Sequence, residues 1–252
     1  MVNEYNEISY AKKMLNSGFL TNRRMYELNI LAKYFYYIGY KPKEVKTKVI
    51  EFCNTHFENF NEAKYFDKIE SILANAKKNT IVEVGSIGIT DKEIEFIQSL
   101  KETNKFNEVL FCLMVIKRIR EKLGQQAYLN CKYSKFSKMC GLSSTKAIYP
   151  ILRRMEELGL IRICRNSNVE ILFNVNTTHG KPVLAVNDFD NICAYYRNYT
   201  GRSRYIECQS CGKMVRARGN RQRYCKACYA EKQLESDREY QKKKYQSKIL
   251  DY

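Results

Sequence analysis

Four cysteines near the end of the chain have a spacing that suits a metal ion. Cys208 and Cys211 form one C-x2-C pair, and Cys225 and Cys228 form a second pair after thirteen intervening residues. Two such pairs can surround one ion with a tetrahedron of thiolates, each sulfur about 2.3 Å from the ion. The pattern predicts a zinc ribbon over residues 206–230 that holds one structural Zn2+.

The ligand set also indicates what this ion does. A catalytic zinc needs an open coordination position, whereas four cysteine ligands close the site. A redox dithiol is another use of paired cysteines, but the chain lacks the βαβ pattern that accompanies one. Basic residues between and beside the pairs would offset the negative charge of the thiolates. They are Lys213, Arg216, Arg218, Arg221, Arg223 and Lys226.

Other residues that can bind metals are scattered along the chain. Cys131, Cys140 and Cys164 could form a second site, but isolated cysteines are usually buried apolar residues, and we favour that interpretation. His56 and His179 each stand alone, so we expect neither to be a metal ligand or a catalytic base. The sequence therefore predicts one metal site.

The charge of the chain points to a polyanionic partner. The sequence has 44 Lys and Arg against 27 Asp and Glu, a net charge of +17. From Tyr195 onward there are 15 basic and six acidic residues, so about half of the excess lies around the cysteine pairs. Such an excess attracts nucleic acid. An anionic membrane would call for a basic amphipathic helix with a bulky apolar face, and we find no convincing one.

The expected compartment follows from absent signals and from the cysteines. The longest apolar run, Val109 to Ile116, is too short to cross a bilayer, and the first residues lack the features of a signal peptide. Close cysteine pairs read as metal ligands where thiols stay reduced. We expect a cytoplasmic protein without a membrane partner.

Helical elements dominate the predicted fold, which is mainly α with small β elements. Apolar residues at helical spacing predict a helical bundle over residues 1–80, and the tyrosines of LAKYFYYIGY read as core rather than as a base-stacking surface. Residues 81–103 read as a strand–helix connector. In it TIVEVGSIGIT forms the strand, and Thr90 with Glu93 forms a capping box for a helix that reaches Leu100.

Residues 104–176 have the element order of a winged helix-turn-helix. A helix from Phe106 to Ile119 with one apolar face ends at Gly124, and AYLNCKY forms a short strand. SKFSKMCG and LSSTKAIYPILRRMEELGL then form two helices, with Gly141 in the turn between them. IRICR and VEILFNV form a hairpin around Asn166, Ser167 and Asn168. An ancillary strand–helix linker follows over 177–205.

The second helix of this segment is the expected recognition helix. Ile148, Leu152, Met155 and Leu158 form its apolar stripe, which leaves the opposite face for the major groove. Pro150 departs from the pattern, so the helix should start late or bend there. Arg162 and Arg165 of the hairpin would contact flanking phosphates. The expected DNA-contacting residues are Ser144, Thr145, Lys146, Tyr149, Arg153, Arg162, Arg165, Arg216, Arg218, Arg221 and Arg223.

The last segment, residues 231–252, reads as a basic C-terminal helix. It contains the run Lys242, Lys243 and Lys244. Such a run is either solvated or follows the phosphates of a bound nucleic acid.

Several motifs together resemble a known group of proteins. ITDKEI, the GLSS turn, DNICAYY, and CQSCGK followed by RQRYCKAC are similar to winged-helix plus zinc-ribbon proteins of bacteriophages and mobile elements of Gram-positive bacteria. The resemblance covers roughly residues 80 to 240. It implies DNA binding in the control of transcription, replication or recombination, in the cytosol of a bacterial host.

We therefore expect a sequence-specific protein that binds double-stranded DNA and is not an enzyme. One alternative is an adaptor that binds a recombinase or a replication protein through the ribbon. Another is a nucleic-acid-processing enzyme, which would need converging acidic metal ligands that Asp188, Asp190 and scattered glutamates do not supply from sequence. An RNA target and the oligomeric state stay open, because backbone charge does not distinguish RNA from DNA.

Overall fold

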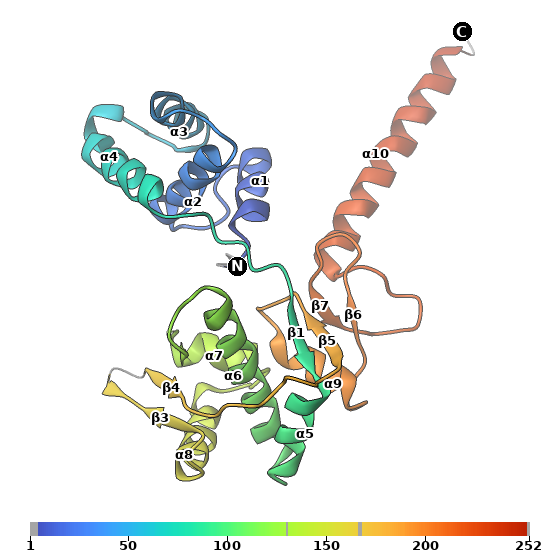
Figure 1. Ribbon diagram of the computed structural model, residues 1–252. Helices are drawn as coiled ribbons and strands as arrows, with labels where there is room; N and C mark the ends of the chain where they lie inside the picture. Colours follow the sequence, from blue (N-terminus) through green and yellow to red (C-terminus); the bar gives the residue numbers. More distant parts are fainter. Residues whose placement is uncertain (1–4, 130, 166–167, 251–252) are drawn as a thin grey trace. The chain divides into compact units, whose positions relative to one another are not determined.

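The computed structural model describes residues 5–129, 131–165 and 168–250 (Figure 1). The chain divides into two compact units, Met1–Gly85 and Ser86–Tyr252. Helices dominate both units, and three small sheets occur among the described residues. The predicted mainly helical fold with small β elements is confirmed. No helix in the described ranges is long and apolar enough to span a membrane.

The described residues of the first unit form four helices, and the periodicity predicts three or four. Gly18 and Gly39 have φ of 77° and 96°, backbone conformations that glycine adopts at low cost where a helix ends. Asn61 starts the last helix, since its side chain accepts from the Lys64 amide at 3.1 Å. The helices are α1 (Glu7–Ser17), α2 (Arg24–Tyr37), α3 (Pro42–His56) and α4 (Glu62–Lys78).

The aromatic cluster at the end of α2 is only partly buried. Leu31 and Phe35 belong to the core of the first unit. Tyr37 and Tyr40 are instead exposed, with 61% and 38% of their surface accessible. The prediction that these tyrosines are core residues is wrong for these two, because the chain turns away at Gly39 and leaves them outside the packed face of α2.

A nearly fully buried helix, α6 (Asn104–Lys122), forms the centre of the second unit. The apolar residues predicted on one face are buried, and so is every other residue from Phe106 to Ile116. It contacts helices α5 (Asp91–Ser99) and α9 (Ile192–Tyr199). A helix that is packed on all sides needs apolar residues all around, which a one-face pattern does not describe.

A two-stranded sheet joins the beginning of this unit to a distant segment. Strand β1 (Ile87–Thr90) pairs antiparallel with β5 (Pro182–Val186). The strand predicted over residues 80–90 is thus shorter than expected. The capping box is confirmed, since the Glu93 carboxylate accepts from the Thr90 amide at 2.8 Å. The segment 177–205 contains the predicted strand and helix, β5 and α9, and these pair with β1 and pack on α6 rather than being ancillary.

The segment expected to be a winged helix contains the expected elements in the expected order. Strand β2 is only two residues long, and the sheet order is β2-β4-β3. Gly141, with φ of 62°, follows the first helix of the pair. Asn166 and Ser167 of the hairpin turn lie outside the described residues. The elements are β2 (Tyr128–Leu129), α7 (Tyr133–Met139), η1 (Thr145–Ala147), α8 (Ile148–Glu157), β3 (Ile161–Ile163) and β4 (Val169–Ile171).

Pro150 has the effect that the sequence predicts, a late helix start. Helix α8 begins at Ile148 after the short 3-10 turn η1, which puts Pro150 in its first turn. A first-turn residue has no intrahelical acceptor for its N–H, so proline costs little there. The predicted apolar stripe is buried at Leu152 and Met155, but Leu158 is 37% exposed because α8 ends at Glu157.

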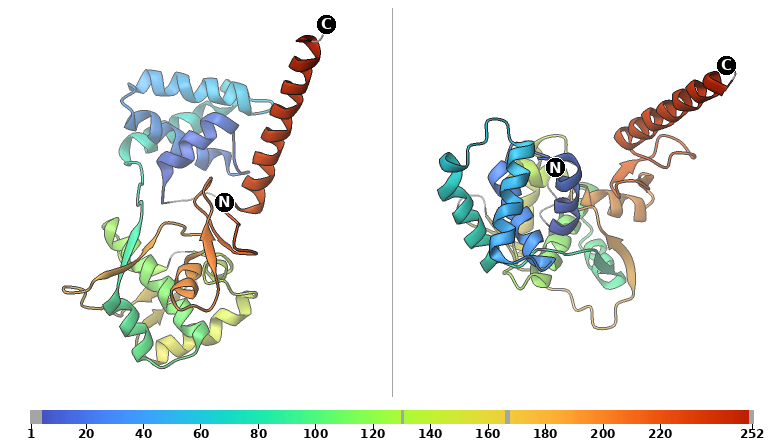
Figure 2. Two further views of the ribbon diagram at one scale, coloured as in Figure 1. Left: turned by 90° about the vertical axis from the view of Figure 1, so that its right-hand side faces the viewer. Right: turned by 90° about the horizontal axis from the view of Figure 1, so that it is seen from above.

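The chain ends with a hairpin and a long helix. Strands β6 (Tyr205–Glu207) and β7 (Met214–Arg216) pair antiparallel, and α10 (Lys226–Leu250) follows. Figure 2 shows α10 as one uninterrupted helix. It begins five residues before the predicted basic helix. The side chains of Lys243 and Lys244 lie outside the described part of the chain.

Arg197 of α9 ties this hairpin to the rest of the unit. Its guanidinium donates to the Glu108 carboxylate of α6 at 2.6 Å and to the carbonyl of Gly141 at 3.3 Å. It also donates to the phenol oxygen of Tyr205, in β6, at 3.4 Å. One side chain therefore contacts the central helix, the turn that leads to η1 and α8, and the C-terminal hairpin.

Candidate metal centre and nucleic-acid interface

The first cysteine pair lies in the tight turn between β6 and β7. The Cys208 amide donates to the Lys213 carbonyl at 2.9 Å, and the Gly212 amide donates to the Cys208 carbonyl at 2.8 Å. Gly212 has φ of 69°, a conformation that strains other residues. The turn is thus closed by backbone hydrogen bonds and holds Cys208 and Cys211 close together.

The second pair lies at the start of α10 and contacts the first pair. Cys228 is in the first turn of the helix, where the Tyr229 amide donates to the Cys225 carbonyl at 2.9 Å. The Cys225 amide donates to the sulfur of Cys208 at 3.2 Å. The hairpin and the helix therefore meet at their cysteines.

The four sulfur atoms lie close enough to bind one metal ion. The sulfurs of Cys208, Cys211, Cys225 and Cys228 all lie within 4.8 Å of one another. The sulfurs of Cys211 and Cys225 are 3.8 Å apart, which is about the edge of a tetrahedron with metal–sulfur bonds of about 2.3 Å. Cys208 and Cys228 are buried and the other two are half-buried, so an ion held here would be largely shielded from water.

Backbone amides favour the thiolate form of one of these cysteines. Burial alone would disfavour the charged form of Cys208. The amides of Cys225, Cys211 and Ser210 outweigh burial and lower the pKa of the Cys208 thiol to about 6. A sulfur that is already ionised at neutral pH can bind a cation without first losing a proton.

The remaining cysteines do not form a second metal site among the described residues. Cys140 is buried next to Cys112 and Cys193, and burial raises the pKa of all three thiols. Cys164 is half-buried at the far end of the β3–β4 hairpin. The preferred interpretation, that the scattered cysteines are mainly buried apolar residues, holds for Cys112, Cys140 and Cys193.

The residues expected on the recognition helix lie on the surface. Lys146 is exposed, Tyr149 is 53% exposed, and the side chain of Arg153 is 83% exposed. Ser144 is exposed as well and caps η1, accepting from the Lys146 amide at 3.1 Å. Thr145 is half-buried. The structure thus brings these five residues to one short stretch of surface at the start of α8.

Acidic neighbours partly neutralise the basic residues of this surface. Arg162 donates to the Glu170 carboxylate at 3.0 Å across the β3–β4 hairpin. Arg153 lies 4.0 Å from the Glu157 carboxylate, one turn further along α8. Arg165 is exposed at the hairpin turn.

The basic residues around the cysteines have no such neighbours. From Cys208 to Ala230 the sequence has six basic residues and no acidic one. All six are exposed, and none of them forms an ion pair within the described residues. Their charge is therefore free to attract an anionic partner. Four of the six are arginines, namely Arg216, Arg218, Arg221 and Arg223.

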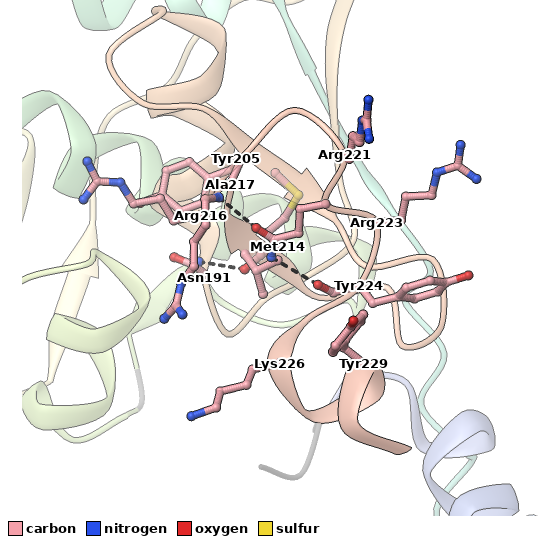
Figure 3. Close-up of a pocket in the computed structure, with 13 residues that line it drawn as sticks. Asn191, Tyr205, Met214, Arg216, Ala217, Arg221, Arg223, Tyr224, Lys226 and Tyr229 are labelled. Carbon is pink, nitrogen blue, oxygen red and sulfur yellow. Dashed lines mark hydrogen bonds between the residues drawn. The ribbon is translucent and has the colours of Figure 1, made fainter. Parts of the chain in front are cut away.

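These arginines surround a hollow that the sequence did not predict. It has a volume of about 1110 Å³ and lies between the β6–β7 hairpin and the start of α10 (Figure 3). Three tyrosines from different elements line it, namely Tyr205, Tyr224 and Tyr229. The tyrosine content of the segment was visible in the sequence, but their convergence depends on the cysteine turns.

Comparison with family models, with curated proteins and with solved structures finds no match to this chain. The function is therefore inferred from the site itself.

The acidic residues near the cluster are engaged in supporting the hairpin. The Asp188 carboxylate accepts from the Met214 amide at 2.8 Å and from the Asp190 amide at 3.1 Å. Burial and the nearby Asp188 carboxylate raise the pKa of Asp190. The observed role of Asp188 is thus to hold β7 against the segment before α9.

Proposed function

We propose that the chain binds nucleic acid through a basic surface built around a structural zinc ion. The observation that carries this proposal is the set of unpaired arginines around the four-cysteine cluster. A phosphate backbone is the common partner of such a set, because each contact releases counterions from the nucleic acid. We further propose that the partner is double-stranded DNA.

Zinc is the ion that the ligand chemistry favours. Soft thiolates select zinc or iron among common cellular metals, and a single ion among four cysteines at ribbon spacing is usually zinc. The ion would be held by Cys208, Cys211, Cys225 and Cys228 and would join the hairpin to α10. With four protein ligands the ion is assigned a structural role.

The surface at the start of α8 is assigned to sequence reading. In the proposed winged helix, Lys146, Tyr149 and Arg153 face the major groove, and Arg162 and Arg165 contact phosphates beside it. The proposed role is sequence-specific binding in the control of transcription, replication or recombination, in a phage or mobile element of Gram-positive bacteria. No catalytic step is assigned.

A second candidate is an adaptor that binds a recombinase or a replication protein. The ion pair of Arg162 with Glu170 favours it, because a surface of mixed charge is more typical of protein contacts than of DNA contacts. The adaptor would use the α8 surface or the ribbon for its protein partner, and it predicts weak, unselective DNA binding.

The test is a binding titration with the full, metal-loaded chain. Fluorescence anisotropy with a labelled duplex is measured at several salt concentrations, alongside genomic footprinting of the tagged protein. We expect affinity to fall steeply with salt and a few sharp genomic sites to appear. A flat salt dependence, with no DNA recovered from cells, would contradict the proposal and favour the adaptor.

A further inference from the structure

The hollow beside the four cysteines has a lining that differs from an ordinary basic surface. Its thirteen lining residues combine five cations with three tyrosines and include no carboxylate. Figure 3 shows the side chains of Arg221 and Arg223 extending away from the hairpin, with the Tyr224 ring beside Arg223 and Tyr229 at the start of α10. The lining thus combines aromatic rings with positive charge.

The tyrosines are held where their rings stay available. Tyr229 is 59% exposed, although it follows directly on the buried Cys228 in the first turn of α10. Tyr224 precedes Cys225 and is half-buried, and the Lys232 ammonium lies over one face of its ring, 4.9 Å from the centre. A base that stacks on Tyr224 would use the other face or displace Lys232. Both tyrosines are anchored through their backbones next to the cysteine cluster, and neither ring is packed into a core.

The aromatic lining of the hollow favours unpaired bases over a duplex. Its volume of about 1110 Å³ is on the order of the space that small-molecule ligands occupy, roughly 300–1000 Å³. In a duplex the base faces are stacked on one another and cannot reach tyrosine rings in a hollow. Single-stranded nucleic acid exposes these faces, and proteins commonly bind it by aromatic stacking in a positively charged groove.

We propose that this hollow binds a single-stranded stretch of nucleic acid. Bases stack on Tyr224 and Tyr229, while Arg216, Arg218 and Arg221 contact the phosphates. The inference rests on the proposed nucleic-acid binding and adds a strand specificity to it. A chain whose arginines contact duplex phosphates around the cysteines, and whose tyrosines stack on an unpaired segment here, would prefer a junction between the two forms.

The test compares single-stranded and duplex binding by the full, metal-loaded chain. The variant Tyr224→Leu/Tyr229→Leu removes both rings but keeps apolar bulk, and Tyr224→Phe/Tyr229→Phe keeps the rings. Tyr37→Leu/Tyr40→Leu, in the first unit, is the matched control for loss of two exposed tyrosines. Affinity for a labelled 15-nucleotide single strand and for a 15-base-pair duplex is measured by anisotropy, and metal content is checked for each variant.

The leucine variant should bind the single strand about tenfold or more weakly, since each stacked base contributes about that factor. Its duplex affinity should stay within about twofold of the wild type. The phenylalanine variant and the Tyr37/Tyr40 control should bind both ligands normally. Photo-crosslinking of a single strand that carries 5-iododeoxyuridine should label the peptide with Tyr224 or Tyr229.

Two results would overturn the inference while leaving the proposed function intact. One is normal single-strand affinity in a leucine variant that retains its metal, and the other is crosslinking confined to other peptides. If the wild type binds neither the duplex nor the single strand, the proposed function itself fails. The two failures are therefore distinguishable in one set of measurements.

Discussion

The second unit has two basic surfaces, and their cations are in different electrostatic states. On the surface formed by α8 and the β3–β4 hairpin, Arg162 and Arg153 have glutamate neighbours at 3.0 Å and 4.0 Å. Around the cysteine cluster, Arg216 and Arg221 are exposed and have no ion pair within the described residues. Both surfaces are basic, but among the described residues only the first has carboxylates beside its arginines.

This difference shows that a count of basic residues does not measure attraction to phosphate. An arginine with a carboxylate neighbour exchanges one anion for another when it contacts DNA, so its gain is reduced by the strength of that ion pair, about 0–1 kcal/mol for an exposed pair. An arginine without an ion pair breaks no such pair when it contacts a phosphate, and its attraction to the phosphate is reduced by salt. We therefore expect the arginines at the cysteines to provide affinity and the α8 surface to provide selectivity.

The largest expected effect comes from removing one metal ligand. Cys208→Ser should abolish binding of the single zinc ion, because structural sites of this kind contribute about 10–16 kcal/mol only with their full ligand set. Helix α10 has no buried side chain among its described residues after Cys228. Without the ion, its first turn loses its attachment to the hairpin, and an isolated helix is only marginally stable in water. Elemental analysis and circular dichroism should show loss of metal and of helical signal.

The matched control is Cys164→Ser, which replaces a half-buried cysteine away from the cluster. It should keep one zinc per chain and nearly all of the helical signal. Equal metal content in both variants would show that the four cysteines are not the binding site.

The next largest effect is expected from the unpaired arginines. Replacing Arg216, Arg218, Arg221 and Arg223 by alanine should weaken specific and non-specific duplex binding together. It should also reduce the salt slope by about one unit for each phosphate that the variant no longer neutralises. The measurement is a set of anisotropy titrations from low to physiological salt.

The charge-matched control replaces four exposed lysines of the first unit, Lys12, Lys13, Lys43 and Lys77, by alanine. It has the same net charge as the arginine variant but leaves the surface around the cysteines unchanged. An equal loss of affinity in both variants would mean that only total charge matters, and the contrast between the two surfaces would then carry no weight.

A smaller and more selective effect is expected at α8. Lys146→Ala, Tyr149→Ala and Arg153→Ala should each weaken binding to the preferred site by about 1–3 kcal/mol and leave random duplex binding nearly unchanged. Competition titrations with specific and random duplexes measure this preference. If only the fourfold arginine variant loses the preference for the specific duplex, the arginines at the cysteines read the bases. The roles proposed for the two surfaces would then be exchanged.

The smallest expected effect is a gain. Glu170→Gln removes the carboxylate that pairs with Arg162 and keeps the size of the side chain. Duplex affinity should rise by about twofold to fivefold, because an exposed ion pair is weak and its release frees one cation. Glu95→Gln, whose partner Lys92 lies on α5, is the control and should change nothing. An unchanged affinity in Glu170→Gln would show that Arg162 does not contact the duplex.

The sequence predicted those features that depend on local spacing. The paired cysteines, the capping box of Thr90 with Glu93 and the late start of α8 at Pro150 all involve residues a few positions apart. Within each cysteine pair, and between Thr90 and Glu93, the interacting residues are three positions apart. Their spacing in the sequence is therefore enough to predict the interaction.

Features that depend on distant partners were not predictable in this way. Strand β5 pairs with β1 although the two lie far apart in the sequence, and Tyr196 of α9 packs fully buried against the ring of Phe111 in α6. The residue spacing of β5 does not indicate that it pairs with β1, and the spacing of α9 does not indicate that it packs on α6. The same holds for the tyrosine-lined hollow, since Tyr205 reaches it only because the hairpin folds back onto α10.

The position of Arg197 has a consequence for how the two surfaces would act on one DNA molecule if both bind it as proposed. By contacting both Gly141, in the turn before α8, and Tyr205, in the C-terminal hairpin, it keeps the two surfaces at a fixed separation. Two sites on a rigid frame behave as a bivalent ligand, and the second site binds at a high effective concentration only where the spacing fits. The length of DNA that the protein protects should therefore be constant. Inserting five base pairs between the segment that contacts the α8 surface and the segment that contacts the arginines at the cysteines should lower the affinity, because the two surfaces could no longer bind together.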